Sequence, residues 1–341
     1  MALTSRVNTK PSCGRATGLP CTPNSVLHPS IQIYRCIESG LRQWRCHPVC
    51  LSSASKAYTD RQKRPPVFHH RNDSAVKLGQ CNIGDYIALN EDESKHACVV
   101  LRLKDGDVVE LYDGYGTVVS GKLALSGGRQ DNEESSKKNK SARLRRKRNV
   151  GGAGVLLETE PKHYEQPHPQ WLVAVACGSL KGGRGDWMIE KLAEIGAAGF
   201  IPLLTERSPK IDTGGTSGRE ERWERLSISV MKQSLQPYKM TLYDPCSVQE
   251  LVSEYIINQD KAVAFVGVED AQPLHPFWVS SMQREFGTGL IIIGPEGDFT
   301  AEESQILEGH GTYPVGLGNK RLRTETAAIT MLAYMTVAQS L

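Results

Sequence analysis

The 341-residue sequence has no long hydrophobic run, and no apolar stretch approaches the roughly 18–20 residues that a membrane-spanning helix needs. Two nucleotide-binding motifs are also absent. There is no GxxxxGKS or GxxxxGKT phosphate loop, and no GxGxxG follows a candidate strand. The sequence therefore indicates no membrane association and no phosphate loop of either kind.

Acidic residues are scarce in the N-terminal segment. Residues 1–59 contain seven Lys or Arg but only one acidic residue, Glu38, and they are rich in Ser and Thr. This composition is typical of an organellar transit peptide, and the segment lacks the apolar core of a secretory signal. We interpret residues 1–62 as a transit peptide, with the chloroplast stroma favoured over the mitochondrial matrix. A disordered native tail is the alternative.

Cysteines are concentrated in the same segment, which holds five of the nine. The other four are scattered along the chain and are interpreted as reduced thiols, because disulfide frameworks need paired cysteines in a small secreted chain. His47 lies between Cys46 and Cys50, but no second pair of Cys or His completes a tetrahedral metal site. We therefore expect no metal.

Residues 63–165 are interpreted as a β domain with an insertion at 126–152. Short apolar stretches alternate here with turn signals such as Asp105-Gly106 and Asp113-Gly114, a pattern that predicts a compact barrel. The stretch 98–103 (CVVLRL) is read as a strand that enters a hairpin at Asp105-Gly106. Asn90-Glu91-Asp92 is read as another turn.

The insertion contains a strongly basic block. Between residues 137 and 148, eight of twelve residues are Lys or Arg and none is acidic. Such a block can contact RNA phosphates through counterion release, or it can be a solvated loop, and both interpretations stay open. The candidate RNA-binding residues are Lys137, Lys138, Arg145 and Arg146.

From residue 166 to residue 341 the pattern changes to alternating strands and helices. Its short apolar runs lack polar alternation, which suits strands buried on both faces of a parallel sheet. These runs are WLVAVAC, FIPLL, AVAFVGV, LIIIG and YPVGLG. Helical periodicity fills 186–197, 221–235 and 247–257, and Thr300 and Glu303 have the spacing of a capping box. The pattern predicts a doubly wound α/β fold with ligands at the C-terminal strand ends.

Two loops at such strand ends carry candidate site residues. Residues 293–299 (IGPEGDF) contain Gly294 and Gly297, which let a backbone approach a ligand closely. Residues 317–326 (LGNKRLRTET) carry three cations, and Thr324 is expected to cap the last helix. Two ordinary strand-to-helix turns are the alternative.

The sequences GPEGDFTAEE at 294–303 and LGNKRLRTETAA at 317–328 resemble the 16S ribosomal-RNA uracil-N3 methyltransferases (RsmE-like) of the SPOUT superfamily. Residues 181–208 and 95–116 resemble two further segments of that family, the second from its PUA-like barrel. In the first of these, the matching residues are Lys181, Glu190, Lys191, Glu194, Gly196, Pro202, Glu206 and Arg207.

The resemblance implies a SPOUT-type parallel sheet with a trefoil knot, preceded by an N-terminal PUA-like β-barrel. It also implies S-adenosyl-L-methionine as cofactor, small-subunit ribosomal RNA as substrate, methylation at N3 of a uridine, and a homodimer. The cofactor is expected between three loops, on Val266, Gly267, Gly294, Pro295, Glu296, Gly297, Leu317, Gly318 and Leu322.

The expected catalytic residues are Arg323 and Glu325. Arg323 is the candidate for stabilising charge on a uracil carbonyl, and Glu325 for orienting Arg323 or accepting the N3 proton. Arg184 and Arg207 are candidate RNA-phosphate ligands. For Arg207, a structural ion pair with Glu206 or another neighbour is the alternative.

Some positions depart from the family pattern, namely Asp298, Asn319, Lys320, Lys232 and Gln236. They leave open a SPOUT methyltransferase with another RNA target. A protein of another class, a non-catalytic RNA-binding factor for ribosome assembly, is the third interpretation.

Overall fold

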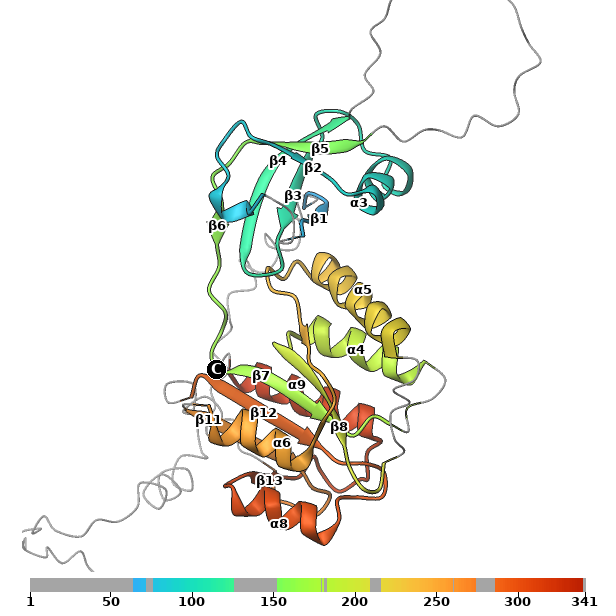
Figure 1. Ribbon diagram of the computed structural model, residues 1–341, viewed down its shortest axis with the longest axis vertical. Helices are drawn as coiled ribbons and strands as arrows, with labels where there is room; N and C mark the ends of the chain where they lie inside the picture. The colour runs from blue at the N-terminus through green and yellow to red at the C-terminus, as the bar shows by residue number, and fades with distance from the viewer. Residues whose placement is uncertain are drawn as a thin grey trace, which may run out of the picture. The chain divides into compact units, whose positions relative to one another are not determined.

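The computed structural model describes residues 64–71, 76–125, 152–178, 180, 183–208, 216–259, 261–273 and 286–339 (Figure 1). The predicted transit peptide and the basic block lie outside these residues. All described residues fall within one compact unit, Arg64–Leu341. The predicted domain boundaries within this unit stay predictions.

The first part of the unit is a six-stranded sheet with the order β1-β3-β4-β5-β2, in which β6 also pairs with β4. Only the β1–β3 pair is parallel, and the other pairs are antiparallel. The strands are β1 (Val67–His69), β2 (Tyr86–Ala88), β3 (Val108–Tyr112), β4 (Thr117–Leu125), β5 (Ala153–Leu157) and β6 (Lys162–His163). A short 3-10 helix, η1 (Leu78–Gln80), precedes β2.

The β3–β4 hairpin turns at Asp113 and Gly114, as the sequence predicts. The Asp113 carboxylate accepts hydrogen bonds from the backbone N–H groups of Tyr115 and Thr117, at 2.7 and 2.9 Å. Gly114 has a φ of 79°, which a side chain would disfavour. This turn therefore sets the register of the β3–β4 pair.

Two predictions for this domain are wrong. Asn90 does not begin a turn: its side chain accepts a hydrogen bond from the Glu93 backbone N–H and caps α3 (Glu91–Lys95). The run 98–103 is not a strand, because the chain continues into the π-helical turn η2 (His96–Val100). Val100 in that turn is 68% exposed, so the apolar run does not reflect burial. Asp105-Gly106 is consequently a turn but does not join two paired strands.

The second part of the unit contains seven parallel strands in the order β10-β8-β7-β12-β11-β13, with β9 beside β8. Every strand pair of this sheet within the described residues is parallel, so the predicted parallel sheet is confirmed. The strands are β7 (Gln170–Val175), β8 (Gly199–Leu204), β9 (Thr241–Leu242), β10 (Cys246–Ser247), β11 (Ala262–Gly267), β12 (Thr288–Ile293) and β13 (Tyr313–Val315). The trefoil knot stays a prediction.

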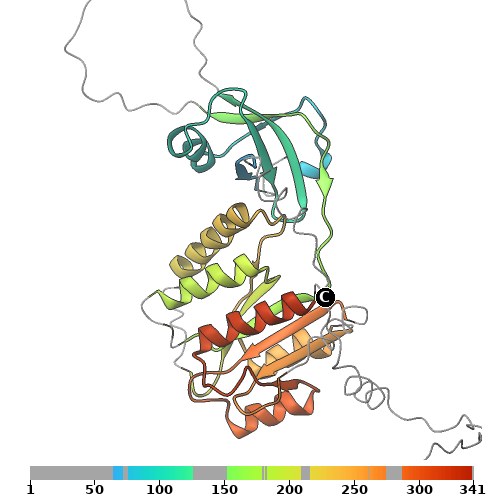
Figure 2. The same cartoon turned by 180° about the vertical axis from the view of Figure 1, so that it is seen from behind.

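The central strands are buried on both faces. In β12, Ile291 and Ile293 pack in one hydrophobic cluster with α4 (Arg184–Ile195), α5 (Thr216–Ser234) and α9 (Thr324–Gln339). Leu290 and Ile292 pack in another with α6 (Val248–Val252) and α8 (Ala301–Gly309). Figure 1 has α6 in front of the sheet, and Figure 2 has α9 in front of it. Burying each such side chain contributes about 1.5–3 kcal/mol, which explains the unbroken apolar runs. The expectation fails only for β13, an edge strand whose Tyr313 is 52% exposed.

The predicted helices are present with shifted ends. They are α4 (Arg184–Ile195), α5 (Thr216–Ser234), α6 (Val248–Val252) with the π-helical turn η4 (Ser253–Ile257), α8 (Ala301–Gly309) and α9 (Thr324–Gln339). The capping box between Thr300 and Glu303 is confirmed, with both reciprocal hydrogen bonds present. Within the described ranges, no helix combines the length and apolar character needed to cross a membrane.

The four later cysteines are free thiols, as predicted. Cys81, Cys177 and Cys246 are buried and Cys98 is half-buried. Burial raises the pKa of Cys177 to about 11, so its thiol is protonated at neutral pH and contributes as a small apolar side chain.

Contacts between the β domain and α5 enclose a histidine. Met231 of α5 packs against Val67, Tyr112 and Val118. Beside this cluster, burial lowers the pKa of His69 from 6.5 to about 4, with the charges of Lys239 and Lys232 adding to the effect. His69 is therefore neutral in the folded protein at neutral pH.

This burial predicts a pH-dependent stability. Between pH 6.5 and 4 the unfolded chain binds a proton that folded His69 does not bind. The free energy of unfolding that depends on neutral His69 is therefore complete above pH 6.5 and falls by about 3 kcal/mol towards pH 4. We expect His69→Gln to flatten this slope in urea titrations at several pH values. His310→Gln, at an exposed histidine, is the control, and an unchanged slope in His69→Gln would contradict the account.

Candidate active site

The parallel register brings the ends of three strands together. In β11, Val266 pairs with Ile292 of β12, and Gly267 pairs with Val315 of β13. The loops that follow these strands therefore begin side by side at the C-terminal edge of the sheet. This is the edge at which open parallel sheets bind ligands.

A cavity lies between these loops and encloses about 620 Å³ of space, part of it open to solvent. Its wall combines glycines, apolar side chains and charged groups of both signs. The lining residues are Gly267, Val268, Glu269, Ile293, Gly294, Pro295, Glu296, Asp298, Val315, Leu317, Gly318, Lys320, Arg321, Leu322, Thr324 and Ala327.

Seven of the nine residues predicted to bind the cofactor line this cavity, namely Gly267, Gly294, Pro295, Glu296, Leu317, Gly318 and Leu322. The other two do not. Val266 is buried in the cluster on the α6 side of the sheet. A Cβ on Gly297 would face the side chain of Arg207, at 3.7 Å, and not the cavity. The structure thus does not place Val266 and Gly297 in the cavity wall, and their contact with the cofactor stays a prediction.

Two arginines tie the cavity loops to one another. Arg207 donates from Nη1 to the carbonyl oxygens of Gly297 and Phe299, at 2.9 and 3.3 Å. Arg321 donates from Nη2 to the Glu296 carbonyl at 2.6 Å, and its Nε lies 3.8 Å from a carboxylate oxygen of Glu269. Both guanidiniums thus satisfy carbonyls of the 294–299 loop that no helix or sheet satisfies.

The sequence left open whether Arg207 forms an ion pair with Glu206 or another neighbour. The recorded partners of Arg207 are the two backbone carbonyls and not Glu206. The backbone N–H of Glu206 donates to the Glu303 carboxylate at 2.9 Å, which ties the end of β8 to α8. A phosphate contact by Arg207 stays a prediction.

Glu325 is paired with Arg184 and not with Arg323. Arg184 Nη1 lies 3.3 Å from Glu325 Oε1 and 3.7 Å from a carboxylate oxygen of Glu296. The Arg323 side chain is exposed and makes no recorded contact with any residue that the structure describes. The structure thus brings Glu325 against Arg184, and the expected catalytic roles of Glu325 and Arg323 stay predictions.

Thr324 also has a different role from the one predicted. It is the first residue of α9, and the carbonyl of Arg323 accepts the first helical hydrogen bond, from Ala327. The Thr324 hydroxyl instead donates to the Gly294 carbonyl at 3.5 Å. It links the start of α9 to the loop after β12.

Backbone constraints explain two glycines of the segment that follows β13, Gly316 beside the cavity and Gly318 in its wall. A Cβ on Gly316 would lie 1.9 Å from the Ala271 carbonyl oxygen, so only glycine fits between these two segments. Gly318 has a φ of 106°, a conformation that L side chains rarely adopt. Sequence reasoning missed Gly316 because its requirement comes from a segment about 45 residues away in the chain.

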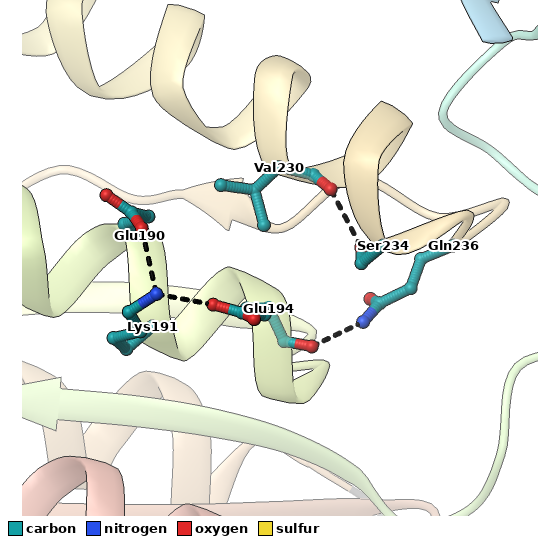
Figure 3. Close-up of polar contacts among 6 residues, drawn as sticks. All are labelled: Glu190, Lys191, Glu194, Val230, Ser234 and Gln236. Carbon is teal, nitrogen blue, oxygen red and sulfur yellow. Dashed lines mark hydrogen bonds and ion pairs between the residues drawn. The ribbon is translucent and has the colours of Figure 1, made fainter. Parts of the chain in front are cut away.

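Three of the departures from the family pattern have structural explanations. Asp298 adopts a φ of 61°, a left-handed conformation that a glycine at this position would adopt without strain. Lys232 donates to Glu93 at 2.7 Å, and both side chains are largely buried. Gln236 donates to the Glu194 carbonyl at 2.8 Å and thereby covers the end of α4 (Figure 3). For Asn319, the contacts give no such explanation.

Figure 3 also shows Lys191 between Glu190 and Glu194. Hydrogen bonds to these two carboxylates, at 2.9 and 2.7 Å, raise the pKa of Lys191. All three are among the residues on which the sequence resemblance rests. The hydrogen bonds of these three side chains stay within α4, so the structure gives the side chains a local role.

The family described as "RNA methyltransferase domain" matches residues 166–336, which is half of the chain. The chain belongs to this family. A second family, described as "RNA methyltransferase PUA domain", matches residues 89–130. The resemblance stated from the sequence is thereby confirmed.

Two curated relatives are both named ribosomal RNA small subunit methyltransferase E. The protein from Bacillus subtilis is 32% identical over 171 residues, which are 48% of this chain and 66% of that protein. The protein from Aquifex aeolicus is 29% identical over 150 residues, 44% of this chain and 61% of its own length. This chain thus spans less than two thirds of the length of each.

A solved structure supports the fold over a longer range. The putative methyltransferase Lpg2936 from Legionella pneumophila, in complex with SAM, has a TM-score of 0.59 and 23% sequence identity. The similarity covers 81% of this chain and 98% of that one. The predicted SPOUT-type fold with a PUA-like N-terminal region is therefore confirmed.

Gly316 provides a test of the backbone packing beside the cavity. We expect Gly316→Ala to lower the free energy of unfolding by about 2–3 kcal/mol, since backbone would have to move to relieve the overlap. Gly309→Ala is the matched control, because a Cβ there meets open space at the end of α8. Urea denaturation measures both. Equal stabilities of the two variants would contradict the close approach of Gly316 to Ala271.

Proposed function

We propose that this RNA methyltransferase uses S-adenosyl-L-methionine to methylate N3 of a uridine in small-subunit ribosomal RNA. The observation that carries the proposal is the cavity at the C-terminal strand ends of the family domain. The names of the two curated relatives support the RNA class, and the cofactor in the Legionella structure supports the methyl donor.

The wall of the cavity has the chemistry that this cofactor needs. Leu317, Leu322 and Ala327 offer an apolar surface for an adenine ring, and the glycines allow backbone groups to approach it. Glu269 and Glu296 are exposed carboxylates that can pair with the cationic amino acid end or with ribose hydroxyls. When bound, the cofactor supplies an electrophilic methyl group.

The chain then has to present the base and stabilise its charge. Uracil N3 becomes nucleophilic when its proton leaves, and negative charge then spreads to the flanking carbonyl oxygens. A guanidinium held near those oxygens stabilises this charge. Arg323 and Glu325 were expected to provide these functions, and both lie in or beside the first turn of α9, next to the cavity residue Thr324.

RNA affinity is proposed to come from cations outside the cavity. Lys137, Lys138, Arg145 and Arg146 belong to a block without acidic residues, which would contact phosphates without reading sequence. The Ser- and Arg-rich composition of residues 1–62 supports import into an organelle, with the chloroplast stroma favoured. A homodimer is proposed from the family resemblance.

Two glycines in neighbouring loops test the cofactor site. Gly318 lines the cavity at a φ of 106°, whereas Gly297 is outside the lining with an ordinary φ. A side chain at such a φ costs about 1–3 kcal/mol, so we expect Gly318→Ala to weaken S-adenosylmethionine binding about tenfold or more. Gly297→Ala should leave binding nearly unchanged. Calorimetry measures both, and wild-type protein that binds no cofactor while folded would contradict the proposal.

The reaction product identifies the target. We expect purified protein and S-adenosylmethionine to produce N3-methyluridine in small-subunit ribosomal RNA, detected by nucleoside mass spectrometry. Small subunits from organelles that lack the protein are the substrate, and reactions without cofactor are the control. A different methylated nucleoside would indicate another RNA target. Cofactor-dependent binding without any product would indicate a non-catalytic assembly factor.

A further inference from the structure

Electrostatic stabilisation of a reacting group requires a donor that is held in place before the reaction. The exposed Arg323 side chain has no recorded contact among the described residues that would hold it. Arg207 and Arg321 are held, but their guanidiniums donate to carbonyls of the cavity loop. The guanidinium of Arg184, by contrast, forms ion pairs with the carboxylates of Glu325 and Glu296.

Arg184 lies between two segments of the site. It is the first residue of α4, and Gly183 before it has a φ of 81° that turns the chain into the helix. Its Nη1 lies 3.3 Å from Glu325 in the first turn of α9 and 3.7 Å from Glu296 in the cavity wall. The guanidinium is thus placed where α9 meets the loop after β12.

The burial of the two partners is unequal. The Glu325 side chain is 5% exposed, whereas that of Arg184 is 32% exposed. A ligand from solvent can therefore reach Arg184, while Glu325 is enclosed behind it. The helix dipole at the start of α9 also favours the negative charge of Glu325.

Glu325 has a second carboxylate oxygen that could accept a hydrogen bond from the guanidinium. Its Oε2 atom is buried and has no hydrogen-bond partner among the described residues. A small rotation of Arg184 away from Glu296, whose carboxylate is at the longer distance, would allow two parallel hydrogen bonds to Glu325. Such a paired arrangement fixes the plane of the guanidinium.

We propose that Arg184 contacts the uracil carbonyl beside N3, and that Glu325 is its positioning residue and not the proton acceptor. This inference rests on the proposed function. The N3 proton passes to water, and the N3 electron pair forms the new bond to the methyl carbon. The methyl–sulfur bond breaks with its electron pair staying on sulfur. Arg184 stabilises the carbonyl charge that grows as the proton leaves.

Single-turnover rates at saturating cofactor and RNA test this assignment. We expect Arg184→Ala to lower the rate about 10²–10³-fold, and Arg184→Lys to restore little of it, because an ammonium lacks the planar fork. Glu325→Gln should also lower the rate. Because the two residues act as a unit, the double variant Arg184→Ala with Glu325→Gln should be no slower than Arg184→Ala alone. Arg323→Ala should have the smaller effect on the rate.

Three other measurements distinguish a catalytic role of Arg184 from a role in cofactor binding, RNA binding or folding. The cofactor dissociation constant and the RNA dissociation constant of Arg184→Ala should stay within about threefold of the wild type, and its melting temperature should match that of Arg222→Ala. Arg222 of α5 is the matched control. It pairs with Asp186 of α4, the helix that begins at Arg184, but it does not line the cavity. The variants are compared in the full chain.

Several results would overturn the inference. A normal single-turnover rate with weakened RNA binding would make Arg184 a phosphate ligand. Additive rate losses for Arg184→Ala and Glu325→Gln would deny the positioning role of Glu325. In both cases the wild type still methylates RNA, so the proposed function survives. A folded wild type that transfers no methyl group would overturn both.

Discussion

The parallel pairing of β11 with both β12 and β13 is the constraint on which the site depends. It sets Gly267 beside Val315 and Val266 beside Ile292, so the loops after three strands start at one edge. The sheet can hold this register because its central strands are buried by helices on both faces. A one-residue slip would exchange the two faces of a strand and lose both layers of packing.

The loops around the cavity are held in place by polar contacts of three arginines. Contacts by Arg184, Arg207 and Arg321 join α4, β8 and the 317–323 loop to the single turn at 294–299. An exposed ion pair contributes only about 0–1 kcal/mol and a hydrogen bond about 0.5–1.5 kcal/mol, so these contacts add little to global stability. Their consequence is geometric, because they fix the positions of carbonyls and side chains in the wall before a ligand arrives. Burial builds the sheet, and directional polar contacts shape the cavity.

The sequence predicted those parts of the molecule that depend on local patterns. Unbroken apolar runs indicated the buried strands, and the Thr300–Glu303 spacing indicated the start of α8. Residues 98–103 were misread, because an apolar run does not distinguish an exposed helical turn from a strand. The pairing of Arg184 with Glu325 could not be predicted, since the two residues are 141 positions apart. For the same reason, the need for glycine at Gly316 was visible only when Ala271 was placed against it.

A crystal structure of the protein with S-adenosylhomocysteine would test the central claim most directly. The account predicts that the ligand lies between Glu269, the 294–298 turn and the 317–322 loop, with its sulfur on the side of the cavity nearest Thr324. The guanidinium of Arg184 should remain paired with Glu325. Density for the ligand elsewhere, such as the hollow lined by Trp223 and Tyr243, would contradict the assignment of the cavity as the methyl-donor site.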